Sequence, residues 1–260
     1  MDEVRLRDRG LTEIPPEVWG KRGLRCLDVG RNRLAQVPAE LAGLTALEEL
    51  YLDGNRLERM PPVGAMPGLR VLDLSVNRLA ALPGGLGGLG RLRYLYAADL
   101  RLAGLPEEIG GLAGLLYLNV NGNGLAELPR QVGRLGALRE LRAMRNALTG
   151  VPEEIGGLAG LRELHLEGNQ ITGLPGTVGA LAELRVLNLR WNHLDAVPGG
   201  VRGLRALRHL DLRANDLRVL PGWVADLPSL DKLDLRWNAR LRLEPGLVGD
   251  LEARGCVVYA

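Results

Sequence analysis

The side chains in this sequence that could do chemistry are its histidines and the acidic residues beside them. His209 and Asp211 are two residues apart, and Glu163, His165 and Glu167 repeat the same spacing. On an extended strand, residues at this spacing face the same side, so each group could supply a general base or half of a metal site. The two histidines fall two strands apart in the sheet predicted below, which separates their backbones by about 10 Å. Surface polar residues are therefore the simpler interpretation of both groups.

The motifs of known catalytic sites are absent from the sequence. It contains no HExxH, CxxC, P-loop or GxSxG pattern. Cys26 faces the same side as the histidines, but the nearest histidine is many repeats away, which disfavours a Cys–His pair. We therefore predict no catalytic residues, no metal ligands and no cofactor. An enzyme or enzyme accessory that processes a peptide or small molecule with polar residues of this face remains the alternative.

These residues belong to a repeat that runs along the whole chain. The pattern LxxLxLxxNxLxxLP recurs every 23 residues, with a single spacing of 22, and opens at Leu24, Leu47, Leu69, Leu92, Leu115, Leu138, Leu161, Leu184, Leu207 and Leu230. Self-similarity at such a period is typical of a solenoid, in which stacked units share one core. An imperfect unit precedes the array, and Cys256–Tyr259 is expected to form a closing strand.

Three positions of the repeat predict its architecture. The alternation in Leu72-Asp73-Leu74 indicates a strand with one buried face. The asparagine after each strand, such as Asn77, is expected to bond backbone groups of its own coil and a neighbouring coil. The proline in segments such as Pro106-Glu107-Glu108-Ile109 suits the first position of a short helical or 3₁₀ turn, with the acids in the first turn.

The full pattern, LxxLxLxxNxLxxLPxxIxxLxx, resembles the leucine-rich repeats of Scribble and Ras-suppressor proteins and of many bacterial proteins. The resemblance implies an α/β solenoid: an arc with a concave parallel β-sheet and short helical or 3₁₀ turns on the convex side. We expect one domain over residues 1–260, with an N-terminal capping unit (1–23), ten repeats (24–246) and a C-terminal cap (247–260). The resemblance also implies a protein-binding scaffold, because that is the usual role of the family.

Tyrosines mark the expected binding surface. Four of the five tyrosines fall on the concave side within four successive repeats, and Tyr94 and Tyr117 occupy the same column. Tyrosine is enriched at binding surfaces, although aromatic residues also suit strands. The predicted surface consists of Tyr51, Asp73, Tyr94, Tyr96, Tyr117 and Asn119, extended by Arg142 and His165. Leu100 replaces the ladder asparagine beside it, so this coil is either distorted or simply filled by leucine.

A second candidate surface follows toward the C-terminus. Arg190, Arg213 and Arg236 form a column, with Trp191 and Trp237 beside it. Arginine next to an aromatic ring suits an acidic peptide, a phosphate or a stacked ring. The equally simple interpretation is a solvated charged rim.

Composition narrows the class of partner. The net charge is only +2, from 33 basic and 31 acidic residues, which disfavours a nucleic-acid partner. There is no apolar run long enough for a membrane span and no segment typical of a secretory signal. Two cysteines, near opposite ends, favour a reduced, cytoplasmic protein. The preference for arginine over lysine is typical of GC-rich genomes, so we expect a bacterial source, and we expect a monomer that binds a protein or peptide.

Overall fold

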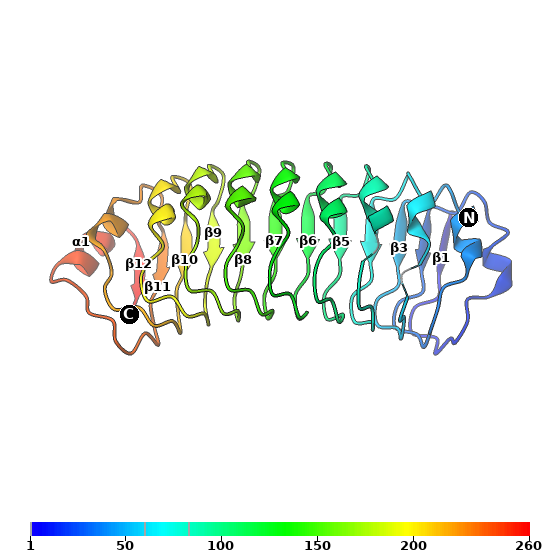
Figure 1. The fold of residues 1–260 in the computed structure, drawn as a ribbon, viewed down its shortest axis with the longest axis horizontal. Coiled ribbons are helices and arrows are strands. Elements are labelled where there is room, and N and C mark those ends of the chain that lie inside the picture. The colour runs from blue at the N-terminus through cyan, green and yellow to red at the C-terminus, as the bar shows by residue number, and fades with distance from the viewer. Residues whose placement is uncertain (1, 60, 83) are drawn as a thin grey trace. The chain divides into compact units, whose positions relative to one another are not determined.

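The structure is a computed structural model that describes residues 2–59, 61–82 and 84–260. Each repeat forms one coil, with a short strand on one side and a return leg on the other (Figure 1). The coils fall into two compact units, Met1–Leu125 and Ala126–Ala260.

The first unit contains six parallel strands, paired in sequence order. They are β1 (Glu3–Arg5), β2 (Cys26–Asp28), β3 (Glu49–Tyr51), β4 (Val71–Asp73), β5 (Tyr94–Tyr96) and β6 (Tyr117–Asn119). The 22-residue spacing leaves the register intact, because Leu50 still pairs with Leu72. The lost residue is therefore absorbed outside the strands.

The second unit repeats this arrangement. Its strands are β7 (Glu140–Arg142), β8 (Glu163–His165), β9 (Val186–Asn188), β10 (His209–Asp211), β11 (Lys232–Asp234) and β12 (Val257–Tyr259). They are also parallel and follow the sequence order. Strand β12 confirms the predicted closing strand. An α-helix, α1 (Leu247–Ala253), precedes it and was not anticipated from the sequence.

The return legs carry 3₁₀ helices, as predicted. In the first unit these are η1 (Pro16–Val18), η2 (Ala39–Gly43), η3 (Val63–Ala65), η4 (Gly84–Gly88) and η5 (Glu107–Gly111). In the second they are η6 (Arg130–Arg134), η7 (Glu153–Gly157), η8 (Gly176–Ala180), η9 (Gly199–Gly203) and η10 (Gly222–Asp226). Within the described residues, no helix is long and apolar enough to cross a bilayer.

The predicted place of the proline is wrong by one residue. Pro106 was expected at the first helical position, but it stands immediately before η5, with φ −69° and ψ 149°. In this extended conformation its carbonyl oxygen accepts the first helical hydrogen bond, from the backbone N–H of Ile109, at 3.0 Å. The proline therefore sets the entry to the turn rather than forming part of it.

The core consists of leucines contributed once per coil at fixed positions. The central residue of the described strands of the array, such as Leu72 and Leu95, is fully buried. Ile109 and Leu112, three residues apart on the return leg, are fully buried as well. Burial of the repeated leucines against the next coil is what joins each coil to its neighbour.

The asparagine ladder joins neighbouring coils as predicted. The side-chain amide of Asn77 donates to the carbonyl oxygens of Leu74, at 2.8 Å, and of Leu52 in the preceding coil, at 3.0 Å. Its Oδ1 accepts a hydrogen bond from the backbone N–H of Leu57, at 2.9 Å. One buried amide thus satisfies backbone groups in two coils.

The coil with Leu100 is filled rather than distorted. Leu100 is buried, and strand β5 keeps its register with β4 and β6. The backbone N–H of Arg101 still donates to the carbonyl oxygen of Leu79, at 3.0 Å, as the corresponding residues do in neighbouring coils. The leucine therefore replaces the rung without moving the coil.

Candidate functional site

The strands present an open face opposite the buried leucines. In the strands of the ten repeats, such as β5 and β6, the central leucine points into the core, so the residues on either side of it point to this face. Register then decides which of them are neighbours: Tyr94 pairs with Tyr117, and Asp73 pairs with both Tyr51 and Tyr96. The sequence predicted these columns correctly.

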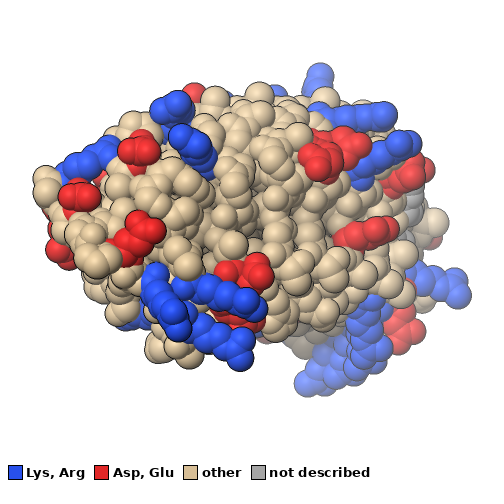
Figure 2. Space-filling view, turned by 60° about the vertical axis from the view of Figure 1, so that its left-hand side comes forward, with Lys and Arg blue, Asp and Glu red and all other residues tan. Residues whose placement is uncertain are grey.

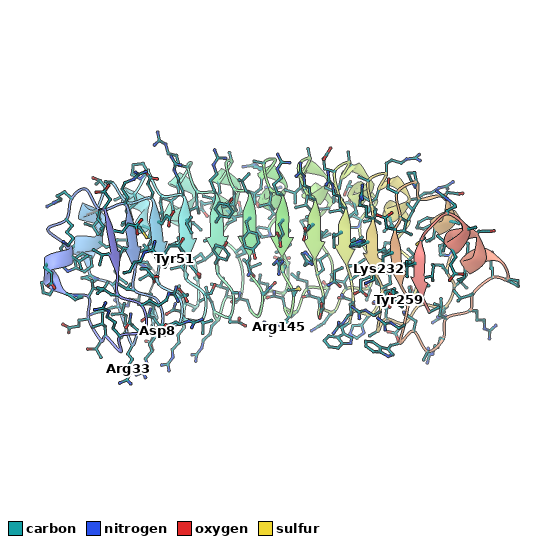
Figure 3. All side chains as sticks on the ribbon, turned by 180° about the vertical axis from the view of Figure 1, so that it is seen from behind. Asp8, Arg33, Tyr51, Arg145, Lys232 and Tyr259 are labelled. Carbon is teal, nitrogen blue, oxygen red and sulfur yellow. The ribbon has the colours of Figure 1, made fainter. Side chains whose placement is uncertain are left out.

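The tyrosines of the first unit form a connected group, here called the tyrosine surface (Tyr51, Asp73, Tyr94, Tyr96, Tyr117 and Asn119). The rings of Tyr96 and Tyr117 lie 4.9 Å apart between centroids and are tilted by 40°. This is a favourable aromatic geometry, and it fixes both rings in place. Tyr94 is 40% exposed beside them, and Tyr51, labelled in Figure 3, lies two strands away on β3.

Burial weakens the acidity of the two polar groups at the edge of this surface. The pKa of Tyr51 is raised to about 12, first by burial and then by its hydroxyl donating a hydrogen bond to Oε2 of Glu49, at 3.1 Å. The pKa of Asp73 is raised above its ordinary value, and burial is again the largest cause. A partner that donates a hydrogen bond to Asp73 would relieve that cost.

Two members of the tyrosine surface also support the backbone. Oδ1 of Asp73 accepts a hydrogen bond from the backbone N–H of Ser75, at 2.9 Å. Oδ1 of Asn119 accepts one from the backbone N–H of Asn121, at 3.1 Å. Asp28 and Asp211 bind the backbone in the same way in their own coils. Their presence at this column is therefore explained by the turn as well as by binding.

Beside the tyrosine surface, Arg7 binds two aspartates in a contact that was not predicted from the sequence and is here called the arginine clasp. The guanidinium of Arg7 donates two hydrogen bonds to Asp53, at 2.6 and 2.9 Å, and a third to Asp28, at 3.1 Å. Gly30 makes the clasp possible, because a β-carbon there would lie 2.5 Å from Oδ1 of Asp53 and 2.7 Å from Arg7. The sequence does contain a sign of this contact, because Arg7, Gly30 and Asp53 occupy the same column in three successive coils.

In the second unit, the structure brings Glu163 and His165 together with Glu140. His165 Nε2 lies 3.0 Å from Glu163 Oε2, and single ligand atoms of the three residues all lie within 4.8 Å of one another. Arg142 already forms an ion pair with Glu140. The group is therefore an ion-paired cluster, and the positive charge of Arg142 opposes a metal ion there. Glu167, the third residue at the same spacing, instead accepts a hydrogen bond from Asn188.

The column Arg190, Arg213 and Arg236, with Trp191 and Trp237, is here called the arginine–tryptophan surface. The guanidinium of Arg190 stacks 3.9 Å above the ring of Trp191. Arg236 lies 4.9 Å from the ring of Tyr259 and 5.8 Å from the ring of Trp237. The tryptophans are 50% and 63% exposed. The sequence predicted that these residues would be adjacent, but not that the C-terminal strand would add a ring.

Each arginine of this surface has a carboxylate nearby. Arg190 lies 3.6 Å from Glu167, Arg213 lies 2.5 Å from Asp211, and Arg236 lies 2.7 Å from Asp234. These acids neutralise the column and reduce its attraction for phosphate. Nε of Arg190 has no hydrogen-bond partner and is the only such buried side-chain atom in the described part of the chain.

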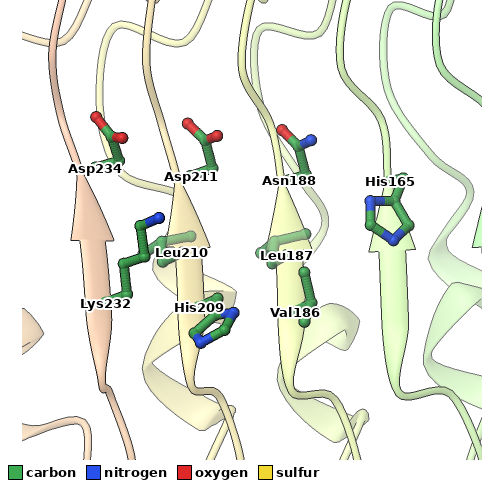
Figure 4. A pocket seen from close by; sticks show the side chains of 9 residues that line it. All are labelled: His165, Val186, Leu187, Asn188, His209, Leu210, Asp211, Lys232 and Asp234. Carbon is green, nitrogen blue, oxygen red and sulfur yellow. The ribbon is translucent and has the colours of Figure 1, made fainter.

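A small hollow lies between β8 and β11 (Figure 4). Val186 and Leu187 form its floor, and His165, His209 and Lys232 lie around it. Its volume is about 160 Å³. Asp211, the expected partner of His209, instead binds the guanidinium of Arg213. The His209–Asp211 pair suggested by spacing is therefore replaced by an Asp–Arg pair.

The two cysteines are buried and not joined to each other. Burial, followed by the charge of Glu49, raises the pKa of Cys26 to about 11. Burial also raises the pKa of Cys256. Since the thiolate is the nucleophile, neither thiol is activated at neutral pH.

Comparison with known proteins gives one consistent result. Residues 54–174 match the model of the family described as "Leucine-rich repeat region", and residues 182–239 match the model described as "Leucine rich repeat". An LRR repeat and ubiquitin-like domain-containing protein of Arabidopsis thaliana is 38% identical over 55 residues, which cover 21% of this chain and 15% of that protein. This match therefore concerns repeats and not the whole plant protein.

Solved structures extend the similarity to nearly the whole chain. An LRR protein of Leptospira interrogans is 30% identical, with a TM-score of 0.87, over 95% of this chain and 69% of that one. The leucine-rich-repeat part of FLRT2, solved in an octameric complex with Latrophilin 3 and Unc5D, is 25% identical, with a TM-score of 0.79, over 98% of this chain and 79% of that one. Relatives from a plant and a bacterium leave the predicted bacterial source a prediction.

Proposed function

Because this chain is a leucine-rich-repeat protein, we propose that it is a recognition scaffold that binds a protein or peptide on the open face of its strands. The observation that carries the proposal is the tyrosine surface. Four of the five tyrosines of the chain lie there, and two of them pack against each other. Rigid aromatic rings with polar tips are typical of the residues that dominate binding energy. FLRT2, whose repeats are similar, was solved in a complex with other proteins.

The chemistry of the tyrosine surface suggests what the partner presents. Tyr94 offers an exposed side chain, Tyr96 and Tyr117 offer an aromatic pair in contact, and Asp73 offers an acceptor whose burial opposes its charge. An apolar side chain flanked by a hydrogen-bond donor fits this combination. We propose Arg142 and His165 as polar extensions in the second unit, each beside an acid of its own strand.

The alternative of an enzyme acting on a small molecule is not favoured by any observation at the hollow. Its volume of about 160 Å³ is below the roughly 300–1,000 Å³ typical of small-molecule sites. We also propose that the scaffold acts as a cytoplasmic monomer without a nucleic-acid partner. Light scattering during size-exclusion chromatography tests the monomer, and the distribution of the tagged protein between cell fractions tests its location.

The first experiment compares three baits in a pulldown from lysate of the source organism: the wild type, Tyr94→Ala/Tyr96→Ala/Tyr117→Ala and Tyr259→Ala. Truncation of a central tyrosine should cost about 2 kcal/mol or more, so a partner retained by the wild type should be lost from the variant. Tyr259→Ala is the matched control, because it removes a tyrosine outside the tyrosine surface. Melting of all three proteins shows whether the variants stay folded.

The pulldown has three possible outcomes, and each of them bears on the proposal. A protein retained by the wild type and by Tyr259→Ala, but not by the folded triple variant, supports the proposal. A protein retained equally by all three baits contradicts the tyrosine surface and moves the site to other residues of the open face. If no bait retains a protein, the scaffold proposal itself loses its support and a ligand screen by thermal shift follows.

A further inference from the structure

Four consecutive coils of the first unit carry an arginine at the same position, just after the ladder residue. These four, here called the arginine row, are Arg33, Arg56, Arg78 and Arg101. Later coils have Gly124, Ala147, Gln170, His193, Asp216 and Ala239 at this position. Since the fold accepts all of these residues there, the repeat does not require arginine for folding.

Backbone hydrogen bonds hold the row in register. The N–H groups of Arg56, Arg78 and Arg101 donate to the carbonyl oxygens of Leu34, Leu57 and Leu79, at 2.9, 2.9 and 3.0 Å. Each of these leucines directly follows the arginine of the preceding coil in the sequence. The backbones of successive arginines therefore lie side by side. Neighbouring parallel strands lie about 4.8 Å apart, and the arginines should follow the same step.

The row lies on an edge of the coils, away from the open face. All four arginines are exposed. Figure 3 shows Arg33 extending away from the lower edge of the ribbon. Figure 2 shows that basic and acidic side chains are interspersed over the face it displays. The row is therefore a surface distinct from the tyrosine surface.

The charge of the row is almost uncompensated. Within the described residues, its one ion pair joins Arg78 to Glu58, at 3.8 Å. This contrasts with Arg7, Arg213 and Arg236, each of which binds a carboxylate closely. Like charges opposite each other on neighbouring strands are destabilising, so the free protein gains nothing from such a row. A ligand of opposite charge at a similar spacing would remove the repulsion.

We propose that the arginine row binds an acidic α-helix of a partner protein, one that presents a carboxylate on each turn of one face. Acids at positions i, i+4, i+7 and i+11 of a helix share a face and span roughly 16 Å. The row spans roughly 14 Å over its three steps. Flexible arginine side chains can make up the difference between this length and that of the helix face. An extended strand places same-face residues about 6.7 Å apart, or about 20 Å over three steps, which fits less well.

Arginine chemistry supports carboxylates as the ligand. The guanidinium binds a carboxylate through two parallel hydrogen bonds, which orients as well as attracts it. All four arginines of the row are exposed, so a partner can approach their guanidinium groups from solvent. Because the pairs form at the surface, binding should weaken with added salt.

The test uses the full chain and two fluorescent helical peptides on a Gln/Ala background. The patterned peptide carries Glu at i, i+4, i+7 and i+11, and the scrambled peptide has the same composition with its acids distributed around the helix. Anisotropy is measured for the wild type, for Arg56→Glu/Arg78→Glu, and for Lys21→Glu/Arg91→Glu, an equal charge change outside the row. The triple tyrosine variant is measured in parallel, and melting shows that all variants are folded.

The expected result is at least a 10-fold loss of affinity for the patterned peptide in Arg56→Glu/Arg78→Glu, with less than a 3-fold change in the control and in the tyrosine variant. The scrambled peptide should bind the wild type at least 5-fold more weakly. Equal binding of the two peptides, or equal loss in both charge variants, would overturn the proposal. So would a single-stranded oligonucleotide that binds the row more tightly than the patterned peptide, since the row would then serve nucleic acid.

Discussion

At the scale of single residues, Asp73 is held where its negative charge is unfavourable. Its folded pKa is raised, chiefly by burial, so the folded state keeps the proton more strongly than the unfolded state does. Below the ordinary pKa, Asp73 is protonated in both the folded and the unfolded state, so its burial causes no loss of stability. As the pH rises through the ordinary pKa and then the folded pKa, stability falls and stays reduced at neutral pH.

Asp73→Asn should therefore raise the melting temperature at pH 7 and leave it unchanged at pH 3. The amide oxygen can still accept the hydrogen bond from the backbone N–H of Ser75. Thermal melts at the two pH values measure the difference, with the exposed Glu13→Gln as control. A variant that is less stable at pH 7, or equally stabilised at both, would show that the charge is not the cause.

Arg7 illustrates the opposite case, a charge that its neighbours need. The side chains of Asp28 and Asp53 are only 14% and 17% exposed, and Arg7 lies against both. Arg7→Gln should reduce the free energy of unfolding by about 1–3 kcal/mol, because two partly buried carboxylates lose their cation. Urea unfolding of Arg7→Gln, Asp53→Asn and the double variant forms a cycle. Additive losses within that cycle would argue against direct coupling of the pair.

At the scale of elements, the asparagine ladder and its one leucine rung allow a direct comparison. Asn77 satisfies the N–H of Leu57, whereas the N–H of Leu79, which an asparagine at position 100 would satisfy, has no acceptor among the described residues. Asn77→Leu should cost about 1–3 kcal/mol, the price of an unmade buried hydrogen bond. Leu100→Asn should change stability by less than about 1 kcal/mol, since the new bonds offset the lost leucine burial. Denaturant unfolding of both variants checks the asymmetry, and equal losses would contradict it.

The return legs explain part of the glycine content. A β-carbon at Gly133 of η6 would overlap the carbonyl oxygen of Glu154 in η7, whereas one at Gly136 would meet nothing within 4 Å. Gly133→Ala should therefore cost about 1–3 kcal/mol through overpacking. Gly136→Ala should leave stability unchanged or slightly increase it, because alanine restricts the unfolded chain. Melting curves of the two variants test this difference. Similar melting temperatures would mean that the backbone of η6 and η7 shifts to accommodate the added β-carbon at little cost in stability.

At the scale of the whole molecule, the sequence predicted most of the fold and part of the candidate site. Strand positions, register and the ladder follow from a repeat that places the same residue type at the same position in each coil. Columns of the open face, including Tyr94 beside Tyr117, follow directly. The contact of Arg7 with Asp53 does not follow from the repeat pattern in this way, because it skips the coil of Gly30 and depends on the absence of a β-carbon there. Helix α1 lies outside the repeat pattern and gave no periodic signal.

A repeat protein is stabilised by interactions between neighbouring coils, so distant changes should act independently. We expect the losses of Asn77→Leu and Gly133→Ala to add within about 0.5 kcal/mol in the double variant. Hydrogen exchange should localise each loss to its own coil and the adjacent ones. A double variant far less stable than the sum would indicate unfolding as one cooperative block.

The unit of 22 residues has a genetic consequence. A coil can lose a residue while Leu50 still pairs with Leu72, so the strand side tolerates changes of length made elsewhere in the coil. An in-frame duplication or loss of one unit would then give a chain that still stacks. It would, however, shift every column beyond the breakpoint by one coil. Recombination within the array can thus add or remove coils between two binding surfaces without unfolding the protein. It separates the residues of any binding surface that spans the breakpoint.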